Sequence, residues 1–299
     1  MAAIASRFSR LVRFIPKSDS SKVLLGEPID ANIDVGLATY RGQDVAVRTF
    51  SGTSALQPGE KTDTVETIGR VLSPLTRQEV GTIRCIGLNK YDLQYVSHAR
   101  EMNMALPAVP PLFLKPATSL ADPWPANSIL PKITQLDNTG DYESEMVIVI
   151  GRDAKNVSEA EALDYVLGYT AANDISSRTS QMAQSQWCFS KGFDTSCPLG
   201  PVLASSSLIP DASKLRIRGL KNGNPVQDCG LEDMIFTVPQ LISFLSQGTT
   251  LPAGTIILTG TPPGVGAASN PKNFLKAGDE FAVELLPHVG TLITKFVDE

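Results

Sequence analysis

Histidine and cysteine are both scarce in this 299-residue chain, which limits the chemistry that it offers. It has two histidines and four cysteines. No two cysteines form a C-x-x-C pair, so the sequence provides neither a zinc knuckle nor a disulfide framework, and we expect reduced thiols in a cytoplasmic setting. Imidazole chemistry is restricted to His98 and His288. His288 falls in a predicted turn between two strands and is interpreted as structural or exposed.

Clustered positive charge and long apolar runs are also missing. The net charge is -5 and the isoelectric point is near 5.2. Lysine and arginine are scattered, which argues against a nucleic-acid partner. No apolar run approaches the roughly 20 residues needed to cross a bilayer, so we expect a soluble protein without a membrane partner. Residues 1–18 carry four basic residues and no acid, as a mitochondrial transit sequence does, but their apolar residues also suit an opening strand, the interpretation favoured here.

Short strand-like segments dominate the chain, which predicts an α+β protein that is predominantly β. We expect a small β-rich N-terminal domain and linker over 1–75, and a catalytic domain over 76–299. Predicted strands cover 11–15, 22–25, 45–50, 83–88, 112–116, 146–150, 169–173, 255–259, 280–286 and 291–297. Predicted helices cover 89–104, 158–168 and 237–247, with a connecting helix or linker over 62–80 and a long ordered loop over 187–201.

Two glutamates lead into the most apolar of these strands. Residues 146–150 read Met-Val-Ile-Val-Ile, which is typical of a strand buried on both faces. Because side chains alternate along a strand, Glu143 and Glu145 share the face of Val147 and Val149. Partly buried like charges are tolerated when a cation lies between them or when one is protonated, and a metal is the simplest solution. The alternative is a surface strand end with solvated acids.

Two other groups of polar residues have suggestive spacing. His98 and Glu101 are three apart on the predicted helix, so the carboxylate can orient the imidazole as a general base, unless both are simply exposed. Asp174, Arg178 and Gln181 would face one side of a helical turn that begins near 174. The Gly-rich loop over 260–266 lacks the lysine of a phosphate-binding loop, and we expect its backbone N–H groups to line a substrate.

Taken together and in order, these motifs resemble the fumarylacetoacetate hydrolase family over about residues 80–299. The resemblance is carried by Cys85-Ile86-Gly87-Leu88-Asn89, His98-x-x-Glu101, Phe113-x-Lys115-Pro116, Asp141-Tyr142-Glu143-x-Glu145, Gly168-Tyr169-Thr170 through Asn173-Asp174, Lys191-x-Phe193-Asp194, Pro198-x-Gly200-Pro201 and Thr259-Gly260-Thr261-Pro262-x-Gly264-Val265-Gly266. The resemblance implies the family's rolled mixed β-sandwich and a homodimer.

The resemblance also implies roles for particular residues. A divalent metal would be held by Glu143, Glu145 and Asp174, and His98 with Glu101 would form the catalytic dyad on a lid. The residues that anchor substrate or surround the metal would be Arg178, Gln181, Lys191 and Thr261, with Lys191 among the catalytic groups.

The chain departs from the family pattern before His98. Members usually read G-L-N-Y-x-x-H, whereas eight residues separate Asn89 from His98 here. Tyr91 and Tyr95 lie four apart in this longer segment and would present two rings to a ligand if they share a helical face. We therefore expect a substrate with an apolar or aromatic substituent, unless both tyrosines pack into the domain.

Three carboxylates favour a hard cation, Mg2+ or Mn2+. Such a site suits a 2-oxo acid or a 1,3-diketo acid such as an acylpyruvate, with a metal-stabilised enolate as intermediate. Lys191 and Thr261 would hydrogen-bond the developing oxyanion, and His98 would activate water. We favour hydrolytic C–C cleavage of this small-molecule substrate. The alternatives are an oxaloacetate-type decarboxylase, a keto–enol tautomerase or isomerase, and a non-catalytic metal-binding protein.

Overall fold

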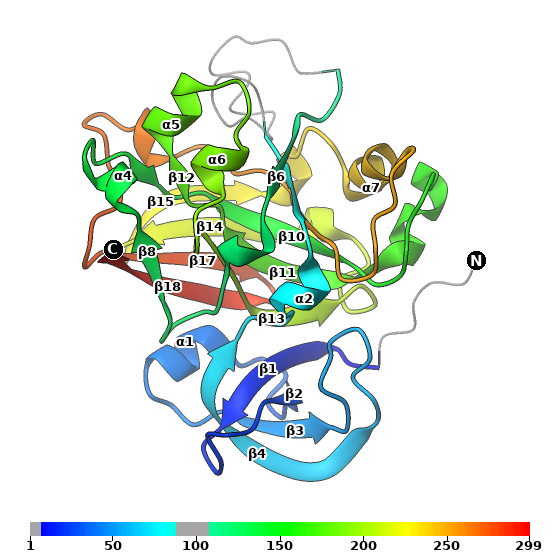
Figure 1. The fold of residues 1–299 in the computed structure, drawn as a ribbon. Coiled ribbons are helices and arrows are strands. Elements are labelled where there is room, and N and C mark those ends of the chain that lie inside the picture. The colour runs from blue at the N-terminus through cyan, green and yellow to red at the C-terminus, as the bar shows by residue number, and fades with distance from the viewer. Residues whose placement is uncertain (1–6, 88–107) are drawn as a thin grey trace.

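The computed structural model describes residues 7–87 and 108–299, and strands make up most of the fold (Figure 1). Tyr91, Tyr95, His98 and Glu101, together with the helix expected over 89–104, lie outside the described residues. None of the described helices is long and apolar enough to span a membrane. The prediction of an α+β, predominantly β protein is confirmed.

Four N-terminal strands pair in a closed ring, in which each strand borders two others. These strands are β1 (Arg10–Pro16), β2 (Leu24–Pro28), β3 (Ala46–Phe50) and β4 (Lys61–Leu72). Helix α1 (Val35–Tyr40) connects β2 to β3 and begins at the N-cap Asp34, whose side chain accepts the Leu37 N–H. The opening strand predicted within residues 1–18 is therefore present as β1.

The helix or linker expected over 62–80 is mostly wrong. Half of the twelve residues of β4 are β-branched, a composition that suits an extended chain paired on both sides. Only Arg77–Val80 is helical, as α2, where Thr76 and Glu79 form a capping box.

A long mixed sheet continues from β1 into the C-terminal part of the chain. Its further strands, in spatial order, are β13 (Cys197–Ser205), β11 (Val166–Asn173), β10 (Ser144–Ile150), β16 (Ile256–Leu258), β5 (Ile83–Ile86) and β6 (Leu112–Lys115), and β7 (Leu120–Ala121) pairs with β13. The strands predicted near 83–88, 112–116 and 255–259 are confirmed.

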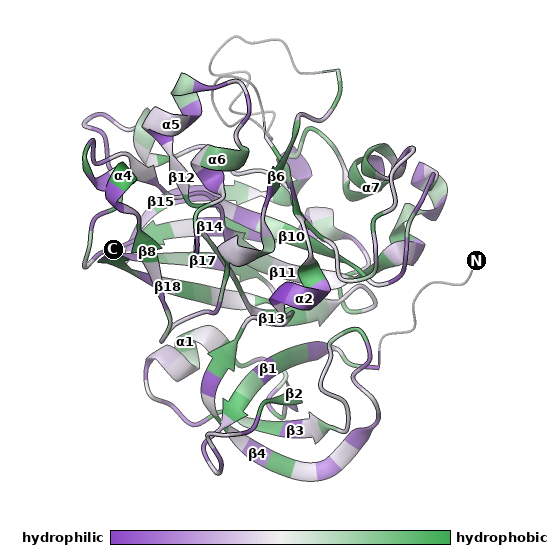
Figure 2. Cartoon of the chain, in the orientation of Figure 1, coloured by the Kyte–Doolittle hydropathy of each residue, from purple (hydrophilic) through white to green (hydrophobic). Residues whose placement is uncertain are grey.

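A second, five-stranded sheet covers one face of the first. It consists of β15 (Asn224–Gly230), β14 (Arg216–Lys221), β17 (Glu280–Leu286), β18 (Gly290–Asp298) and β8 (Asn127–Leu130). A short ladder joins β9 (Gly140–Asp141) to β12 (Ser176–Ser177). Buried apolar residues of both sheets form one core, and Figure 2 shows apolar residues along their strands. His288 lies in the turn between β17 and β18, as predicted, with φ at 86°.

The alternation predicted for the central strand is present in β10. Met146, Ile148 and Ile150 belong to the core between the two sheets. Val147 and Val149 belong to a different core on the opposite face, which β5, β6 and β13 share. All seven residues of β10 are buried. Glu145 therefore lies on the second face, in line with the two valines.

The helices are few and short, and several differ from the prediction. The described helices beyond those named above are α4 (Lys132–Gln135), α5 (Arg178–Ala183), α6 (Cys188–Lys191), α7 (Val238–Ser246) and the 3-10 turns Ala117–Ser119, Glu159–Tyr165, Ala212–Lys214, Leu231–Asp233 and Gly266–Ala268. Helix α7 with its Thr237 cap is confirmed.

Two predicted segments are wrong. The helix expected over 158–168 is a 3-10 helix that stops at Tyr165, because Val166 and Gly168 already pair with β10 as part of β11. The loop expected over 187–201 instead contains α6 and the first half of β13. Its Gly and Pro residues were interpreted as a loop, although strand pairing with β11 accommodates them.

Candidate functional site

The pairing of β10 with β11 brings two acidic residues to one end of the sheet. Ser144 at the start of β10 is the register partner of Asn173 at the end of β11. Glu143 and Asp174 lie next to these partners, and the Asp174 N–H donates to the Glu143 carbonyl oxygen at 2.9 Å. The Asn173 side chain accepts the Glu143 N–H, also at 2.9 Å. An antiparallel register thus places residues 31 positions apart side by side.

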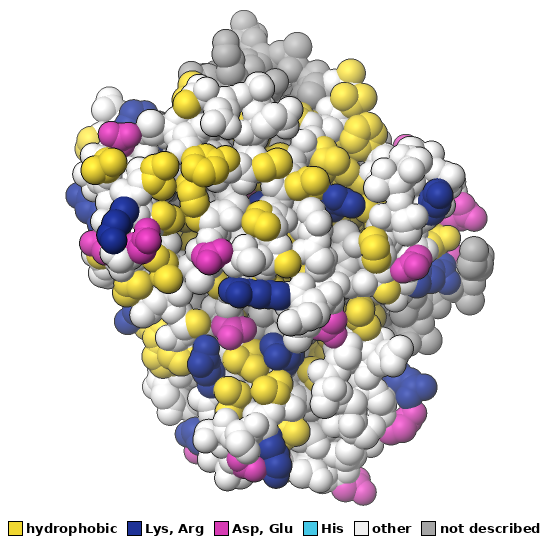
Figure 3. All heavy atoms as spheres, in the orientation of Figure 1, with side chains coloured by type: hydrophobic (Ala, Val, Ile, Leu, Met, Phe, Trp, Pro, Cys, Tyr) yellow, Lys and Arg dark blue, Asp and Glu magenta, His cyan; other side chains and the backbone are white. Residues whose placement is uncertain are grey.

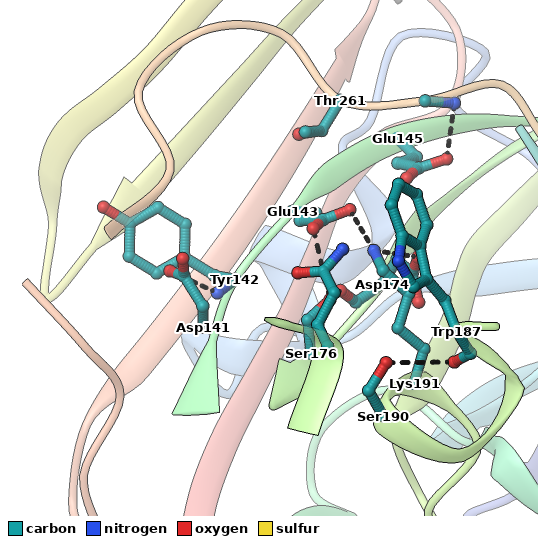
Figure 4. A network of polar contacts seen from close by, with 12 residues as sticks. Asp141, Tyr142, Glu143, Glu145, Asp174, Ser176, Trp187, Ser190, Lys191 and Thr261 are labelled. Carbon is teal, nitrogen blue, oxygen red and sulfur yellow. Dashed lines mark hydrogen bonds and ion pairs between the residues drawn. The ribbon is translucent and has the colours of Figure 1, made fainter. Parts of the chain in front are cut away.

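Glu145 completes a cluster of three carboxylates. One carboxylate oxygen from each of Glu143, Glu145 and Asp174 lies within 4.8 Å of the others. All three residues are at most 2% exposed. Figure 4 shows them converging in front of the central sheet. The three residues that the family resemblance implied as metal ligands are therefore brought together.

Two buried lysines lie against this cluster. The Lys191 ammonium, from α6, donates to Glu143 at 2.8 Å and to Asp174 at 2.9 Å. The Lys115 ammonium, from the end of β6, donates to the other Asp174 oxygen at 2.5 Å and to the Ser196 carbonyl at 2.8 Å. No role was predicted for Lys115. Its position at the end of an apolar strand was a signal that could have identified it as a site residue.

Arg178 contacts the cluster from a direction that the sequence analysis did not predict. Asp174, Arg178 and Gln181 were expected on one helical face, but β12 separates Asp174 from α5, which begins only at Arg178. The guanidinium instead pairs with Glu143 at 2.7 Å and with Asp141 at 2.8 Å, and it donates to the side-chain amide oxygen of Gln181 at 2.9 Å. That part of the prediction is wrong, whereas the Arg178–Gln181 contact is present.

Asp141 is a further buried acid that the sequence analysis passed over. Its carboxylate accepts the backbone N–H groups of Tyr142, Gly266 and Ala267 at 2.8–2.9 Å, besides Arg178. It therefore ties the start of the β9–β10 segment to the Gly-rich loop. A carboxylate saturated in this way holds the backbone in place.

The three clustered carboxylates differ in their neighbours. Burial acts to raise the pKa of Asp174, but Lys115 and Lys191 outweigh it and hold this pKa below its usual value. Glu145 accepts the Gly260 N–H at 2.7 Å, and within the described ranges no lysine or arginine forms an ion pair with it. Burial, then the charges of Asp174 and Glu143, raise the pKa of Glu145 well above its usual range.

The donor set fits a hard divalent cation. The three candidate ligands are carboxylate oxygens, which Mg2+ and Mn2+ prefer. The buried thiols of Cys85 and Cys197 are poor competitors, because burial raises the pKa of Cys197 to about 12 and the pKa of Cys85 well above its usual value. The Lys191 ammonium bridges Glu143 and Asp174, which shows that positive charge is accommodated between these carboxylates.

Thr261 lies in the loop beside the cluster, where the hydroxyl is already engaged. It donates to the Ser144 carbonyl at 3.1 Å and accepts from the Gln227 amide at 2.7 Å. The other end of the Gln227 amide accepts from the Ser144 backbone and hydroxyl. Gln227, which was not predicted as a site residue, therefore links β15 to the start of β10. A hydrogen bond from Thr261 to substrate would have to replace the one to Ser144.

Comparisons with known proteins agree on one family. The model of the family "Fumarylacetoacetate (FAA) hydrolase C-terminal" matches residues 82–297. A caffeoylpyruvate hydrolase of Neonothopanus nambi is 47% identical, with 100% of this chain and 96% of that protein covered. A mitochondrial oxaloacetate tautomerase of Xenopus laevis is 42% identical, with 72% and 65% covered. Among solved structures, a 2-hydroxyhepta-2,4-diene-1,7-dioate isomerase from Mycobacterium marinum is similar with a TM-score of 0.76, 28% identity, and 97% and 99% coverage.

Proposed function

Because this chain belongs to the fumarylacetoacetate hydrolase family, we propose that it is a divalent-metal-dependent enzyme that hydrolyses a C–C bond in an acylpyruvate. The observation that carries the proposal is the buried cluster of Glu143, Glu145 and Asp174. The neighbouring lysines and Arg178 pair with Glu143, Asp174 and Asp141, whereas none of them is an ion-pair partner of Glu145, so a bound cation would stabilise the fully ionised cluster.

The comparisons favour hydrolysis over the other reactions of such a site. The relative that matches along the whole chain is a caffeoylpyruvate hydrolase, and it is also the more identical of the two relatives described above. The second candidate is keto–enol tautomerisation of oxaloacetate, which the relative from Xenopus laevis supports over the shared domain. The substrate of both reactions is a 2-oxo acid. In both, the same carboxylates would hold the metal ion and the same cations would bind the acid.

We propose that Glu143, Glu145 and Asp174 hold Mg2+ or Mn2+. The bound ion would supply Lewis acidity toward the oxo-acid oxygens and would stabilise negative charge that develops on them. Lys115 contributes by holding one Asp174 oxygen at 2.5 Å, which directs the other oxygen toward the cluster. The Gly260 N–H fixes Glu145 in the same way, at 2.7 Å.

The remaining cations and amides would bind the substrate. Lys191 exchanges its two carboxylate contacts for a negatively charged substrate oxygen, and Arg178 and Gln181, already joined at 2.9 Å, present N–H groups from the first turn of α5. Thr261 contributes from the loop that follows β16. These four residues surround the carboxylates with hydrogen-bond donors, which suits an anionic ligand.

His98 and Glu101 are proposed as the base and its orienting partner, on the strength of their spacing in the sequence. His98 would take a proton from water as the water oxygen attacks the distal carbonyl. The bond between that carbonyl carbon and the adjacent methylene carbon then breaks, and the methylene carbon takes up a proton. One acylpyruvate and one water thus give a carboxylic acid and pyruvate. We further propose a homodimer in the cytoplasm.

Product analysis tests this function. The purified protein is incubated with caffeoylpyruvate, acetylpyruvate and oxaloacetate, each with Mg2+, with Mn2+ and with EDTA, and the products are identified by NMR. We expect pyruvate and the matching carboxylic acid in equal amounts from the acylpyruvates, and no turnover in EDTA. Cleavage that persists in EDTA, or an acylpyruvate that is only tautomerised or decarboxylated, would overturn the proposal.

A further inference from the structure

The residues at the start of helix α6 place an aromatic ring next to the catalytic lysine. Trp187 is the N-cap of α6 and has helical backbone angles, and the Lys191 N–H donates to its carbonyl at 3.2 Å. Residues four apart lie on the same side of a helix, so Trp187 and Lys191 face the same way. Figure 4 shows the indole rising from α6 alongside the Lys191 side chain.

The Trp187 ring is held in place by two packing neighbours. It packs edge-to-face against Phe113 of β6, with ring centroids 5.6 Å apart. It also lies directly over Gly87, where an added Cβ would come within 2.5 Å of the indole. A side chain larger than hydrogen at 87 would therefore push the ring away. Phe113 itself is buried, whereas Trp187 is half-buried and keeps part of its surface accessible.

The same Phe113 ring connects Trp187 to the carboxylate cluster. The Lys191 ammonium lies 5.0 Å from the Phe113 centroid while it donates to Glu143 and Asp174. Phe113 thus contacts both the Trp187 ring and the charged group of Lys191. A ligand whose head replaces the contacts of Lys191 would extend its tail along this aromatic surface.

We propose that Trp187, seated on Phe113 and Gly87, forms the wall that binds the apolar or aromatic substituent of the acylpyruvate and so determines substrate preference. The inference rests on the proposed function, since the oxo-acid head must be held at the carboxylate cluster. An aryl group would bury apolar area and stack against an indole that is already held in position. Oxaloacetate carries a carboxylate there and gains neither.

Calorimetry with two probes tests the inference without turnover. Oxalate represents the bare chelating head, and phenylpyruvate represents the head with an aryl substituent. Both are titrated into the full-length protein with saturating Mn2+. We expect Trp187→Leu to weaken phenylpyruvate binding by about three- to tenfold, the range of a lost aromatic contact, and to leave oxalate binding unchanged. Trp187→Phe should restore most of the loss.

Phe189 supplies a matched control on the same helix. It lies two residues from Trp187, is 52% exposed, and contacts Phe193 with ring centroids 5.4 Å apart. Because residues two apart point to different sides of a helix, Phe189→Leu should affect neither probe.

The possible outcomes separate this inference from the function it rests on. If neither probe binds wild-type protein in a metal-dependent way, the proposed function fails. If both bind, but Trp187→Leu leaves phenylpyruvate affinity intact or weakens both probes equally, the function stands and the aromatic wall is wrong. An equal effect of Phe189→Leu on phenylpyruvate binding would also contradict it.

Discussion

Replacement of Glu145 by glutamine tests the metal centre most simply, because it removes one charge and almost no volume. Glu145 accepts the Gly260 N–H and has two other carboxylates within 4.8 Å. The glutamine carbonyl can keep the hydrogen bond to Gly260 while the repulsion from Glu143 and Asp174 disappears. Where Glu145 is ionised, two unit charges at that separation repel by about 3.5 kcal/mol at an effective dielectric constant of 20. Where its raised pKa leaves it protonated, glutamine is a neutral replacement of nearly the same shape. In EDTA, Glu145→Gln should therefore be at least as stable as wild type.

Added metal should make the wild-type protein more stable than Glu145→Gln. A ligand at 100 times its dissociation constant stabilises the folded state by about 2.7 kcal/mol. For a chain of 299 residues this corresponds to a rise in Tm of about 4 °C. Loss of a ligand should weaken binding by about 100-fold or more, since outer-shell changes alone cost up to that much. The stabilisation then falls to about 0.4 kcal/mol, a shift below about 1 °C.

Differential scanning fluorimetry with increasing Mg2+ or Mn2+ measures both effects. Glu159→Gln is a suitable control, since it removes the same charge from an exposed position in a 3-10 turn. This control should show the wild-type metal response. The reasoning is refuted if Glu145→Gln retains the full metal-dependent rise in Tm, or if it is clearly less stable than wild type in EDTA.

Three further variants probe the residues around the metal centre. His98→Ala should lower kcat by about 10²- to 10⁴-fold, the usual effect of a lost general base, with calorimetric metal affinity unchanged; an unaltered kcat would place the base elsewhere. Lys115→Met should lower the free energy of unfolding by about 3 kcal/mol in urea titrations with EDTA, because it removes one partner of a buried ion pair with Asp174; a loss below about 1 kcal/mol would show that Lys191 alone satisfies this carboxylate. The double variant Tyr91→Ala/Tyr95→Ala should reduce kcat/KM for arylated acylpyruvates more than for oxaloacetate, and an equal loss on both would mean that these rings do not contact the substituent.

The strand period explains why part of the site was predictable. Alternation alone places Glu145 on the face of Val147 and Val149, and the structure has it there, because a fully buried strand leaves no freedom to rotate. Asp174 joined the cluster only through the resemblance to a family. Its proximity to Glu143 depends on the register between β10 and β11, which a single sequence does not specify.

Other features depended on contacts that are distant in the sequence. Lys115 at the end of β6 meets Asp174 across 59 positions of the sequence, and Gln227 reaches the start of β10 from the second sheet. The hairpin of β14 and β15 was not predicted, although Asn222-Gly223 joins its strands with φ values of 51° and 77°, a sequence and geometry typical of a tight hairpin turn. That local signal was available, whereas the long-range contacts were not.

The exposed apolar residues on the short helices could not be predicted from the sequence either. Figure 3 shows apolar side chains gathered over the half of the molecule that contains α4, α5 and α6. Exposed members of these elements include Ile133, Met182 and Phe189. The short length of these helices leaves little buried area per residue, so their apolar side chains are only partly covered. Helical periodicity over four to six residues is too short to have predicted which of them face outward.

Isotope incorporation tests the central claim, that this protein cleaves acylpyruvates with water. The protein is incubated with acetylpyruvate and Mg2+ in water enriched in 18O, and the products are analysed by mass spectrometry. Hydrolysis predicts one 18O atom in the carboxylate of the released acetate and none in the carboxylate of pyruvate, with labelling abolished in Glu145→Gln. Release of carbon dioxide in place of acetate, or acetate without solvent oxygen beyond that of an enzyme-free control, would contradict the account.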